Sequence, residues 1–447
     1  MIDIEQIRTN PDAFKRAIAT KRIKLDLDRL LQVDEERRAL TKEVNQLREG
    51  RNRVTDLVTT DGQNRAEHIA RSKVIGAALV VKENELKAVE VEYAALMAHV
   101  PGLPAASVPE GVDDNDNVEL YRVGEVVLPA FKQRDHIELA LLNKMVDFEG
   151  ARFAAGSRAY GLTGDGALLE LAVLRFALDH VLAKGFTAVL PPLMVNEAAM
   201  FGTGYFPMGE DNSYQLEDGK RFLTGTSEVG IVAMQASRML EGLAIGAVDG
   251  ANAPSDRGAA NADSINYKAV RFAGISACFR REAGAAGRDT KGLYRVHQFQ
   301  KVEQVVFCPN DEEVSEQEHM RLLKNSEEIV QALELPYRVV AVCTGDMGLG
   351  QVRKHDIETW MPSREAYCET HSCSTFHDFQ ARRLGIRYVD ADGKKKYVHT
   401  LNNTAIASPR ILIALLENHQ NKEGTIYVPK VLRPYLGGRE VLGGWKF

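Results

Sequence analysis

Apolar residues near the start of the chain recur at alternating spacings of four and three residues along two segments. The first segment carries them at Val33, Leu40, Val44, Leu47, Val54 and Val58, with Arg37 and Arg51 in the two gaps. The second carries them at Ile75, Leu79, Leu86, Val89, Tyr93, Leu96 and Val100, with Lys82 in the gap. A period of 3.5 residues predicts coiled-coil seams. The turn at residues 59–64 is short and polar, so residues 27–100 are expected to form an antiparallel helical hairpin.

The pattern changes after this hairpin. Pro101 and Pro104 end the second helix because proline lacks a backbone donor, and the chain through Asn117 has the composition of a linker. From about residue 120, helical periods alternate with short apolar runs between Gly and Pro turns, which predicts an α+β domain on an antiparallel sheet. We therefore expect two domains, residues 1–105 and residues 106–447. Residues 246–264 are rich in Ala, Gly, Asn and Asp and are expected to form a flexible surface loop.

The composition narrows the class of protein. Of the 447 residues, 45% are hydrophobic and 26% are charged, a balance typical of a soluble globular protein. No apolar window is long enough to span a membrane, and the N-terminus has no signal core. The net charge of −6 argues against wholesale coating of nucleic acid, although a local basic patch stays possible. The five cysteines are an odd number without a CxxC pair, which predicts a reduced, cytoplasmic protein with no membrane association.

Candidate chemistry concentrates between Cys278 and Glu303, a stretch that suggests a strand, a Gly-rich loop and a second strand. Alternate residues of a strand share a face, so Arg280 is expected beside Glu282 on the first strand. On the second strand, one face would carry His297, Phe299, Lys301 and Glu303. Phe299 and Glu303 would lie roughly 13 Å apart, close to the reach from an adenine ring to the amino group of an aminoacyl-adenylate. From spacing alone, a charged solvent face on an ordinary hairpin stays the alternative.

Five segments, taken in chain order, resemble the motifs of one family. Gly185–Pro192 is similar to motif 1 of the class II aminoacyl-tRNA synthetases, and Thr224–Glu228 to the serine-binding TSE motif of their seryl members. Phe279–Glu303 resembles motif 2 in its seryl form, Glu369–Arg383 resembles the ESSCS…DFQARR block, and His399–Arg410 resembles motif 3. The whole chain thus resembles the bacterial-type seryl-tRNA synthetases.

This resemblance implies a role for each matching residue. Catalysis would rest on Arg280, Glu282 and Arg410. L-serine would bind to Thr226, Ser227, Glu228, Glu303 and Thr404. ATP would contact Arg280, Arg281, Glu282, Val296, Phe299, Glu369, Thr370, His371, Ser372 and Arg410. Magnesium bound with ATP would be held by Glu369 and Ser372.

The resemblance also implies a fold, partners and an overall reaction. The fold would be a class II catalytic domain, an antiparallel β-sheet with flanking helices, preceded by a long coiled-coil hairpin. The chain would activate L-serine with ATP, releasing diphosphate, and load it onto tRNA-Ser and, where present, tRNA-Sec, releasing AMP. The hairpin would bind the long variable arm of tRNA-Ser, and motif 1 would lie at a homodimer interface. Two rival functions are a tRNA-independent paralogue that passes an adenylated amino acid to another carrier, and a non-enzymatic RNA-binding protein.

The charge around the hairpin tip bears on its role. Residues 48–73 hold six basic residues and four acidic ones, against an acidic whole. This local excess favours contact with phosphates, whereas a purely structural coiled coil is the plainer interpretation of the spacing. Shape and backbone dominate recognition of RNA helices, so no base-reading residue is named.

Some positions depart from the family pattern. Asn403 and Thr404 stand where the family has Gly-Ser, Pro409 replaces a glycine, and His371 replaces a serine of the ESSCS block. These departures concern the details of the pocket and not the reaction class. Ser408 is expected to cap the helix that begins near Arg410, with Pro409 in the first turn.

The spacing of Cys368, His371, Cys373 and His377 could suggest zinc. If the stretch is a regular strand, His371 and Cys373 share a face with Glu369, and Cys368 points the other way. That arrangement does not build a tetrahedral site, so no zinc is expected.

Overall fold

The computed structural model describes residues 2–245, 266–283 and 291–444 and divides into two compact units, residues 1–101 and residues 102–447. The loop predicted at 246–264 lies outside the described residues, as do residues 284–290 of the predicted Gly-rich loop. Within the described part, no helix is long and apolar enough to cross a membrane.

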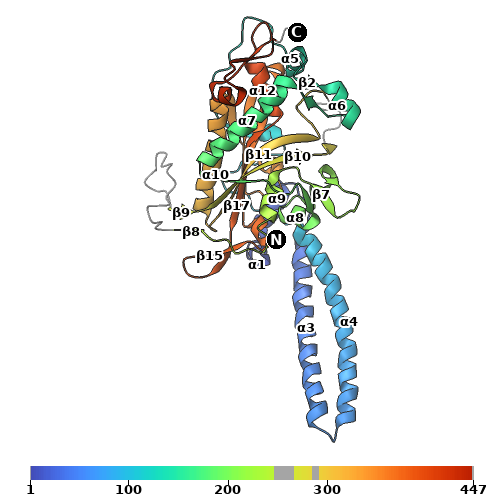
Figure 1. Cartoon of the computed structure of the whole chain (residues 1–447). Coiled ribbons are helices and arrows are strands. Elements are labelled where there is room, and N and C mark those ends of the chain that lie inside the picture. Colours follow the sequence, from blue (N-terminus) through green and yellow to red (C-terminus); the bar gives the residue numbers. More distant parts are fainter. Residues whose placement is uncertain (1, 246–265, 284–290, 445–447) are drawn as a thin grey trace. The chain divides into compact units, whose positions relative to one another are not determined.

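The N-terminal unit is built from four helices, of which two form the predicted hairpin. After α1 (Ile4–Thr9) and α2 (Pro11–Thr20), α3 (Leu27–Thr60) and α4 (Arg65–Ala98) pack along each other, in blue in Figure 1. The seam positions Val33, Val44, Val54 and Leu79 are at most 5% exposed. The Arg37 guanidinium lies 4.2 Å from the centre of the Tyr93 ring, so one predicted gap in the seam is filled by a cation on an aromatic face. The predicted hairpin is confirmed.

The C-terminal unit is organised around an eight-stranded sheet in the order β1-β12-β13-β14-β17-β11-β10-β4. Every neighbouring pair is antiparallel except β10 and β4, so the predicted antiparallel α+β fold is confirmed. The strands are β1 (Val118–Val123), β4 (Thr187–Val189), β10 (Val270–Phe279), β11 (Gln298–Cys308), β12 (Tyr337–Ala341), β13 (Arg353–Met361), β14 (Ala366–His377) and β17 (His399–Ala407).

Helices flank this sheet on both faces (Figure 1). One face packs on α7 (Gly164–Ala183), α10 (Glu312–Ala332) and α12 (Arg410–Asn418), where Val302 and Val306 of β11 join the main core. On the other face, Val305 and Phe307 pack with residues of α9 (Ser227–Ala233) and α11 (Phe379–Leu384). The alternation of side chains along β11 therefore sends Glu303 to the same face as Val305.

Shorter elements complete the unit. The remaining helices are α5 (His136–Leu142), α6 (Phe148–Ala155) and α8 (Glu197–Gly202). The remaining strands are β2 (Val146–Asp147), β3 (Gly161–Leu162), β5 (Met194–Asn196), β6 (Tyr214–Gln215), β7 (Arg221–Leu223), β8 (Ala244–Ile245), β9 (Tyr267–Lys268), β15 (Arg387–Val389), β16 (Lys395–Tyr397), β18 (Ile426–Tyr427) and β19 (Val441–Leu442).

The predicted linker is not a free segment. The Gly102 amide donates to the Leu349 carbonyl at 3.0 Å, and the Ala105 amide donates to the Val352 carbonyl at 2.9 Å. These backbone bonds tie the segment to the residues just before β13, and the compact C-terminal unit begins at Gly102. The predicted linker segment is thus part of the C-terminal unit.

Candidate active site

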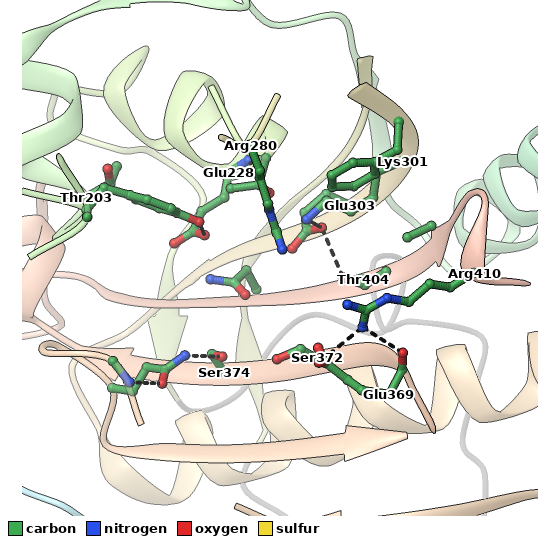
Figure 2. A pocket seen from close by; sticks show the side chains of 18 of the residues that line it. Thr203, Glu228, Arg280, Lys301, Glu303, Glu369, Ser372, Ser374, Thr404 and Arg410 are labelled. Carbon is green, nitrogen blue, oxygen red and sulfur yellow. Dashed lines mark hydrogen bonds and ion pairs between the residues drawn. The ribbon is translucent and has the colours of Figure 1, made fainter. Parts of the chain in front are cut away.

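A cavity of about 370 Å³ opens on the sheet face that carries Glu303. It lies over the strands β11, β17 and β14, with charged side chains converging from both of its walls (Figure 2). Most of the predicted site residues line it: Thr226, Glu228, Arg280, Glu282, Val296, Phe299, Glu303, Glu369, Thr370, Ser372, Thr404 and Arg410.

One end of the cavity holds a buried carboxylate at the start of α9. Glu228 is 4% exposed, and its carboxylate accepts a hydrogen bond from Gln380 Nε2 at 2.7 Å. The Tyr205 hydroxyl lies 3.4 Å from the other oxygen. Burial, followed by the nearby charge of Glu303, raises the pKa of Glu228 to about 7. A carboxylate held this way is poised to receive a cation.

Glu303 is the second acid at this end. Lys301, two residues earlier on β11, places its ammonium 2.5 Å from a Glu303 oxygen. The Thr404 hydroxyl, from the partner strand β17, lies 3.4 Å from the same carboxylate (Figure 2). Burial raises the pKa of Glu303, and the charge of Lys301 opposes that shift. This end therefore offers two acids, one cation and one hydroxyl to a small polar ligand.

The rest of the cavity is rich in arginine and aromatic rings. The Arg280 guanidinium lies 5.2 Å from the centre of the Phe299 ring, and that of Arg410 lies 4.5 Å from the centre of Tyr294. Arg410 also pairs with the Glu369 carboxylate at 3.2 Å, as Figure 2 shows. Burial alone would raise the pKa of Glu369, but the positive charges of Arg410, Lys354 and Arg280 outweigh it and lower this pKa to about 2. Fixed positive charge beside flat rings suits a nucleotide phosphate chain and base.

Arg280 and Glu282 reach the cavity by a route that differs from the prediction. β10 ends at Phe279, and Glu282 has a φ of +52°, so the two residues do not share a strand face. The Glu282 amide donates to Asn212 Oδ1 at 2.8 Å, and its carboxylate pairs with Arg295 at 3.4 Å. Both side chains nevertheless line the cavity. His297, expected on the face of Phe299, precedes β11 and lies with Nδ1 3.0 Å from the Arg280 carbonyl oxygen.

A register shift in β14 changes which residues face the cavity. Ile357 of β13 pairs with His371 and Glu358 pairs with Glu369, so Thr370 is an extra residue. Alternation therefore restarts at Thr370: Ser372 and Ser374 line the cavity with Glu369, whereas Cys373 joins the core behind the sheet. The expectation that His371 and Cys373 share the face of Glu369 is wrong.

Three predicted residues do not line the cavity. Ser227 lies with Oγ 3.5 Å from the Gly274 carbonyl, and the Arg281 amide donates to the Asn212 carbonyl at 3.0 Å. His371 is 1% exposed, with Nδ1 2.9 Å from the Thr370 hydroxyl. Their roles in binding stay predictions. The expected Ser408 cap is wrong: Pro409 is the N-cap residue of α12, and the Ser408 hydroxyl donates to Glu170 instead.

Several lining residues had no predicted role. Lys301 was placed on the correct strand face, and its spacing to Glu303 was the signal that could have identified it as a partner. Tyr205, Gln351 and Asn402 also line the cavity, and nothing in the local sequence points to them. Among the described residues, no three His, Cys, Asp or Glu side chains are grouped so that they could hold a metal ion by themselves.

Two family models match the chain. The family model for the seryl-tRNA synthetase N-terminal domain matches residues 1–104, and that for the tRNA synthetase class II core domain (G, H, P, S and T) matches residues 263–419. The serine–tRNA ligase of Deinococcus radiodurans is 46% identical over 444 residues, covering 99% of each chain. That of Symbiobacterium thermophilum is 41% identical, covering 97% of this chain and 98% of its own.

A solved structure agrees with these relatives. The crystal structure of seryl-tRNA synthetase from Pyrococcus horikoshii, complexed with ATP, superposes with a TM-score of 0.87 at 36% identity and covers 100% of both chains. Full-length coverage at these identities, on the same fold, shows the family. This chain belongs to the seryl-tRNA synthetase family of class II aminoacyl-tRNA synthetases.

Proposed function

We propose that this chain ligates L-serine to tRNA-Ser, and to tRNA-Sec where present, through a seryl-adenylate formed from ATP. The observation that carries the proposal is one cavity with two buried acids at one end and an arginine-rich, aromatic remainder. An amino-acid ammonium fits the first part, and a nucleotide fits the second. Family membership supports the reaction, and the arrangement of side chains supports the roles proposed below.

At the acidic end, serine would bind through its ammonium and its hydroxyl. Glu228 and Glu303 are the carboxylates available to the ammonium, with Thr226 beside them. Thr404 presents a hydroxyl next to Glu303, so it can meet the substrate hydroxyl. A site that hydrogen-bonds the hydroxyl of its substrate disfavours alanine, because its own polar groups would then be left unpaired.

In the arginine-rich part, ATP would bind with its adenine near Phe299 and the backbone of Val296. The serine carboxylate attacks the α-phosphorus, and the bond to the leaving diphosphate breaks. Arg280 would stabilise the charge that develops on the α-phosphate, and Arg410 would hold the γ-phosphate. No side-chain nucleophile is needed, because positioning and fixed positive charge supply most of the catalysis. A ribose hydroxyl of the tRNA terminus then attacks the activated carbonyl, and AMP leaves.

Glu369 and Ser372 fit a magnesium ion that arrives with ATP. Both offer hard oxygen donors on one strand face, and the lowered pKa of Glu369 keeps its carboxylate charged. Asp356 of β13 pairs with Ser372 across the ladder, and one oxygen of this buried carboxyl has no hydrogen-bond partner. The bound ion would neutralise charge on the diphosphate as it leaves. Since Mg²⁺ usually takes only one or two protein oxygens plus phosphates, this small donor set is sufficient.

The helical hairpin would serve as the tRNA-binding domain, residues 1–105, and residues 106–447 as the catalytic domain. Six basic residues around the tip are all exposed: Arg48, Arg51, Arg53, Arg65, Arg71 and Lys73. Such a surface favours contact with an RNA backbone. All five cysteines are free, which accords with the reducing cytoplasm in which we place the protein.

A second copy of the chain would cover apolar side chains around motif 1. Leu171 on α7 is 62% exposed, Leu190 after the edge strand β4 is 81% exposed, and Phe153 on α6 is 95% exposed. Large apolar side chains left exposed in this way favour an interface with a second copy. Sedimentation of the Leu190→Asp variant as a monomer, beside a dimeric parent protein, would support this assignment.

The reaction is tested by ATP–diphosphate exchange with each of the twenty amino acids, with and without Mg²⁺. We expect rapid exchange with serine alone, and only when Mg²⁺ is present. Faster exchange with alanine, glycine or threonine than with serine would overturn the substrate assignment.

A further inference from the structure

Four polar side chains lie between the sheet and α10, behind the strand that carries Thr404. They are Gln304 on β11, Asn403 on β17, and Asn325 and Ser326 on α10, and each is at most 3% exposed. Burying amides and hydroxyls in a core is costly unless their hydrogen bonds are made. Their bonds therefore indicate what this cluster holds in place.

The Ser326 hydroxyl is the centre of the cluster. It donates to the Thr404 carbonyl at 2.8 Å. It accepts from Asn403 Nδ2 at 3.0 Å and from Gln304 Nε2 at 3.2 Å. A serine hydroxyl has one hydrogen and two lone pairs, so the two amides occupy both lone pairs and commit the hydrogen to Thr404.

The two amides are themselves fixed. Asn325 Nδ2 donates to Gln304 Oε1 at 2.7 Å, which sets the orientation of the Gln304 amide. The Leu322 carbonyl on α10 accepts from Asn403 Nδ2 at 2.6 Å. The cluster thus links α10 to β17 through side-chain hydrogen bonds, with Asn403 Oδ1 left as a buried atom without a partner among the described residues.

Thr404 lies where the β-ladder gives it little support. Glu303 of β11 pairs with Thr404, but Val302 pairs with Ile406, so Ala405 is an extra residue. On the other side, the described pairing of β14 with β17 begins at Asn403 and does not extend to Thr404. A residue beside a bulge has fewer ladder bonds to fix its position, and the Ser326 hydroxyl supplies one from α10.

We propose that Ser326, oriented by Gln304 and Asn403, is a positioning residue that sets the selectivity for serine over alanine. This inference rests on the proposed function. The Thr404 hydroxyl can bond the substrate hydroxyl only while its backbone is held toward Glu303. Releasing that backbone weakens the bond between Thr404 and the substrate hydroxyl, a group that alanine lacks. Serine binding therefore suffers, while binding of alanine and of ATP does not.

The test is the Ser326→Ala variant of the full chain, assayed by serine-dependent ATP–diphosphate exchange beside the parent protein. We expect the KM for serine to rise about tenfold, the effect of one lost hydrogen bond. We expect the KM for ATP and the inhibition constant of alanine, measured as a competitor of serine, to change by less than about twofold. If the binding of serine and the binding of alanine weakened equally, Ser326 would have a structural role only, and the inference would be overturned.

A matched control removes a buried hydroxyl elsewhere on the same helix. Ser315 is 1% exposed, and its Oγ lies 2.6 Å from His399 Nδ1, at the far end of β17. Ser315→Ala should lower thermal stability. It should leave the selectivity, the inhibition constant of alanine divided by the KM for serine, unchanged. If this variant lowered the selectivity for serine over alanine as much as Ser326→Ala does, the inference would be contradicted.

A second variant tests the same inference if Ser326→Ala does not fold. Gln304→Met removes one amide from Ser326 at nearly constant volume and should raise the KM for serine by a smaller factor in the same direction. An unchanged KM for serine would contradict the positioning role of this cluster. Failure of the parent protein to activate serine at all would instead refute the proposed function.

Discussion

The ammonium of Lys301 lies 2.5 Å from a carboxylate oxygen of Glu303, and both side chains are almost fully buried, at 6% and 2% exposure. The two residues point to one face of β11 because they are two positions apart. Breaking a buried ion pair by removing one partner leaves an uncompensated charge, which costs about 3–5 kcal/mol unless the group neutralises. Lys301 therefore favours the ionised form of Glu303 and opposes the upward shift in pKa that burial causes.

Replacing Lys301 with methionine is expected to raise the KM for serine by about tenfold or more near neutral pH. Without the ammonium, burial shifts the pKa of Glu303 further upward, and the protonated acid no longer attracts the serine ammonium. Raising the pH should restore part of the loss. Lys396→Met is the control, since it removes an ion pair with Asp390 in which the lysine side chain is 47% exposed. A KM for serine equal to that of the parent would contradict the assigned role of Lys301.

The pH dependence of serine use should follow Glu228. Its pKa of about 7 means that the carboxyl is largely neutral below that pH and charged above it. Since only the carboxylate binds an ammonium well, kcat/KM for serine should rise between about pH 6 and about pH 8. Glu228→Gln should lower kcat/KM and remove this rise. Glu327→Gln, at another acid with a pKa raised by burial but outside the cavity, should leave the profile unchanged. A parent profile that is flat across this range would contradict the assignment.

Buried histidines should make the fold acid-sensitive. His319 bridges His355 and Thr375, and burial lowers the pKa of His319 to about 3 and that of His399 to about 3. As the pH falls below about 6.5, the unfolded chain binds protons that the folded chain does not, so stability present above that pH is lost. Each of these two histidines should cost about 2 kcal/mol of unfolding free energy at about pH 5. Urea unfolding across this pH range measures the expected loss of unfolding free energy. Equal stability at about pH 7.5 and pH 5.5 would contradict the prediction.

Regular local patterns were enough to predict part of the molecule. The heptad spacing of the hairpin repeats over many turns, so each seam residue supports the same interpretation. On β11, simple alternation placed Phe299, Lys301 and Glu303 on one face, and the cavity contains all three.

Features made by distant parts of the chain could not be predicted in this way. The extra residue Thr370 shifts the faces of β14, and its hydroxyl bonds the Thr359 hydroxyl on the neighbouring strand. Ser408 bonds Glu170, 238 positions away in the sequence, instead of capping its own helix. Gln380 orients Glu228 across 152 positions. Local spacing contains no information about such partners.

Shortening the hairpin should separate activation from transfer. Arg29 pairs with Glu92 near the base of the hairpin, so residues 42–85 can be replaced by a short Gly-Ser turn that leaves this ion pair in place. Serine-dependent diphosphate exchange should persist, while charging of tRNA-Ser falls steeply. The triple variant Arg48→Ala, Arg51→Ala and Arg53→Ala should show a milder loss and a weaker dependence of tRNA binding on salt. Full charging by the shortened protein would make the hairpin a structural element.

The most direct test of the whole account is transfer of labelled serine to a tRNA-Ser transcript by the intact chain, with AMP and diphosphate measured in the same reaction. The account predicts seryl-tRNA together with one AMP and one diphosphate for each serine transferred. It also predicts no charging of a transcript that lacks the long variable arm. Formation of seryl-adenylate without any seryl-tRNA would contradict it, and would favour an adenylating enzyme that delivers serine to another carrier.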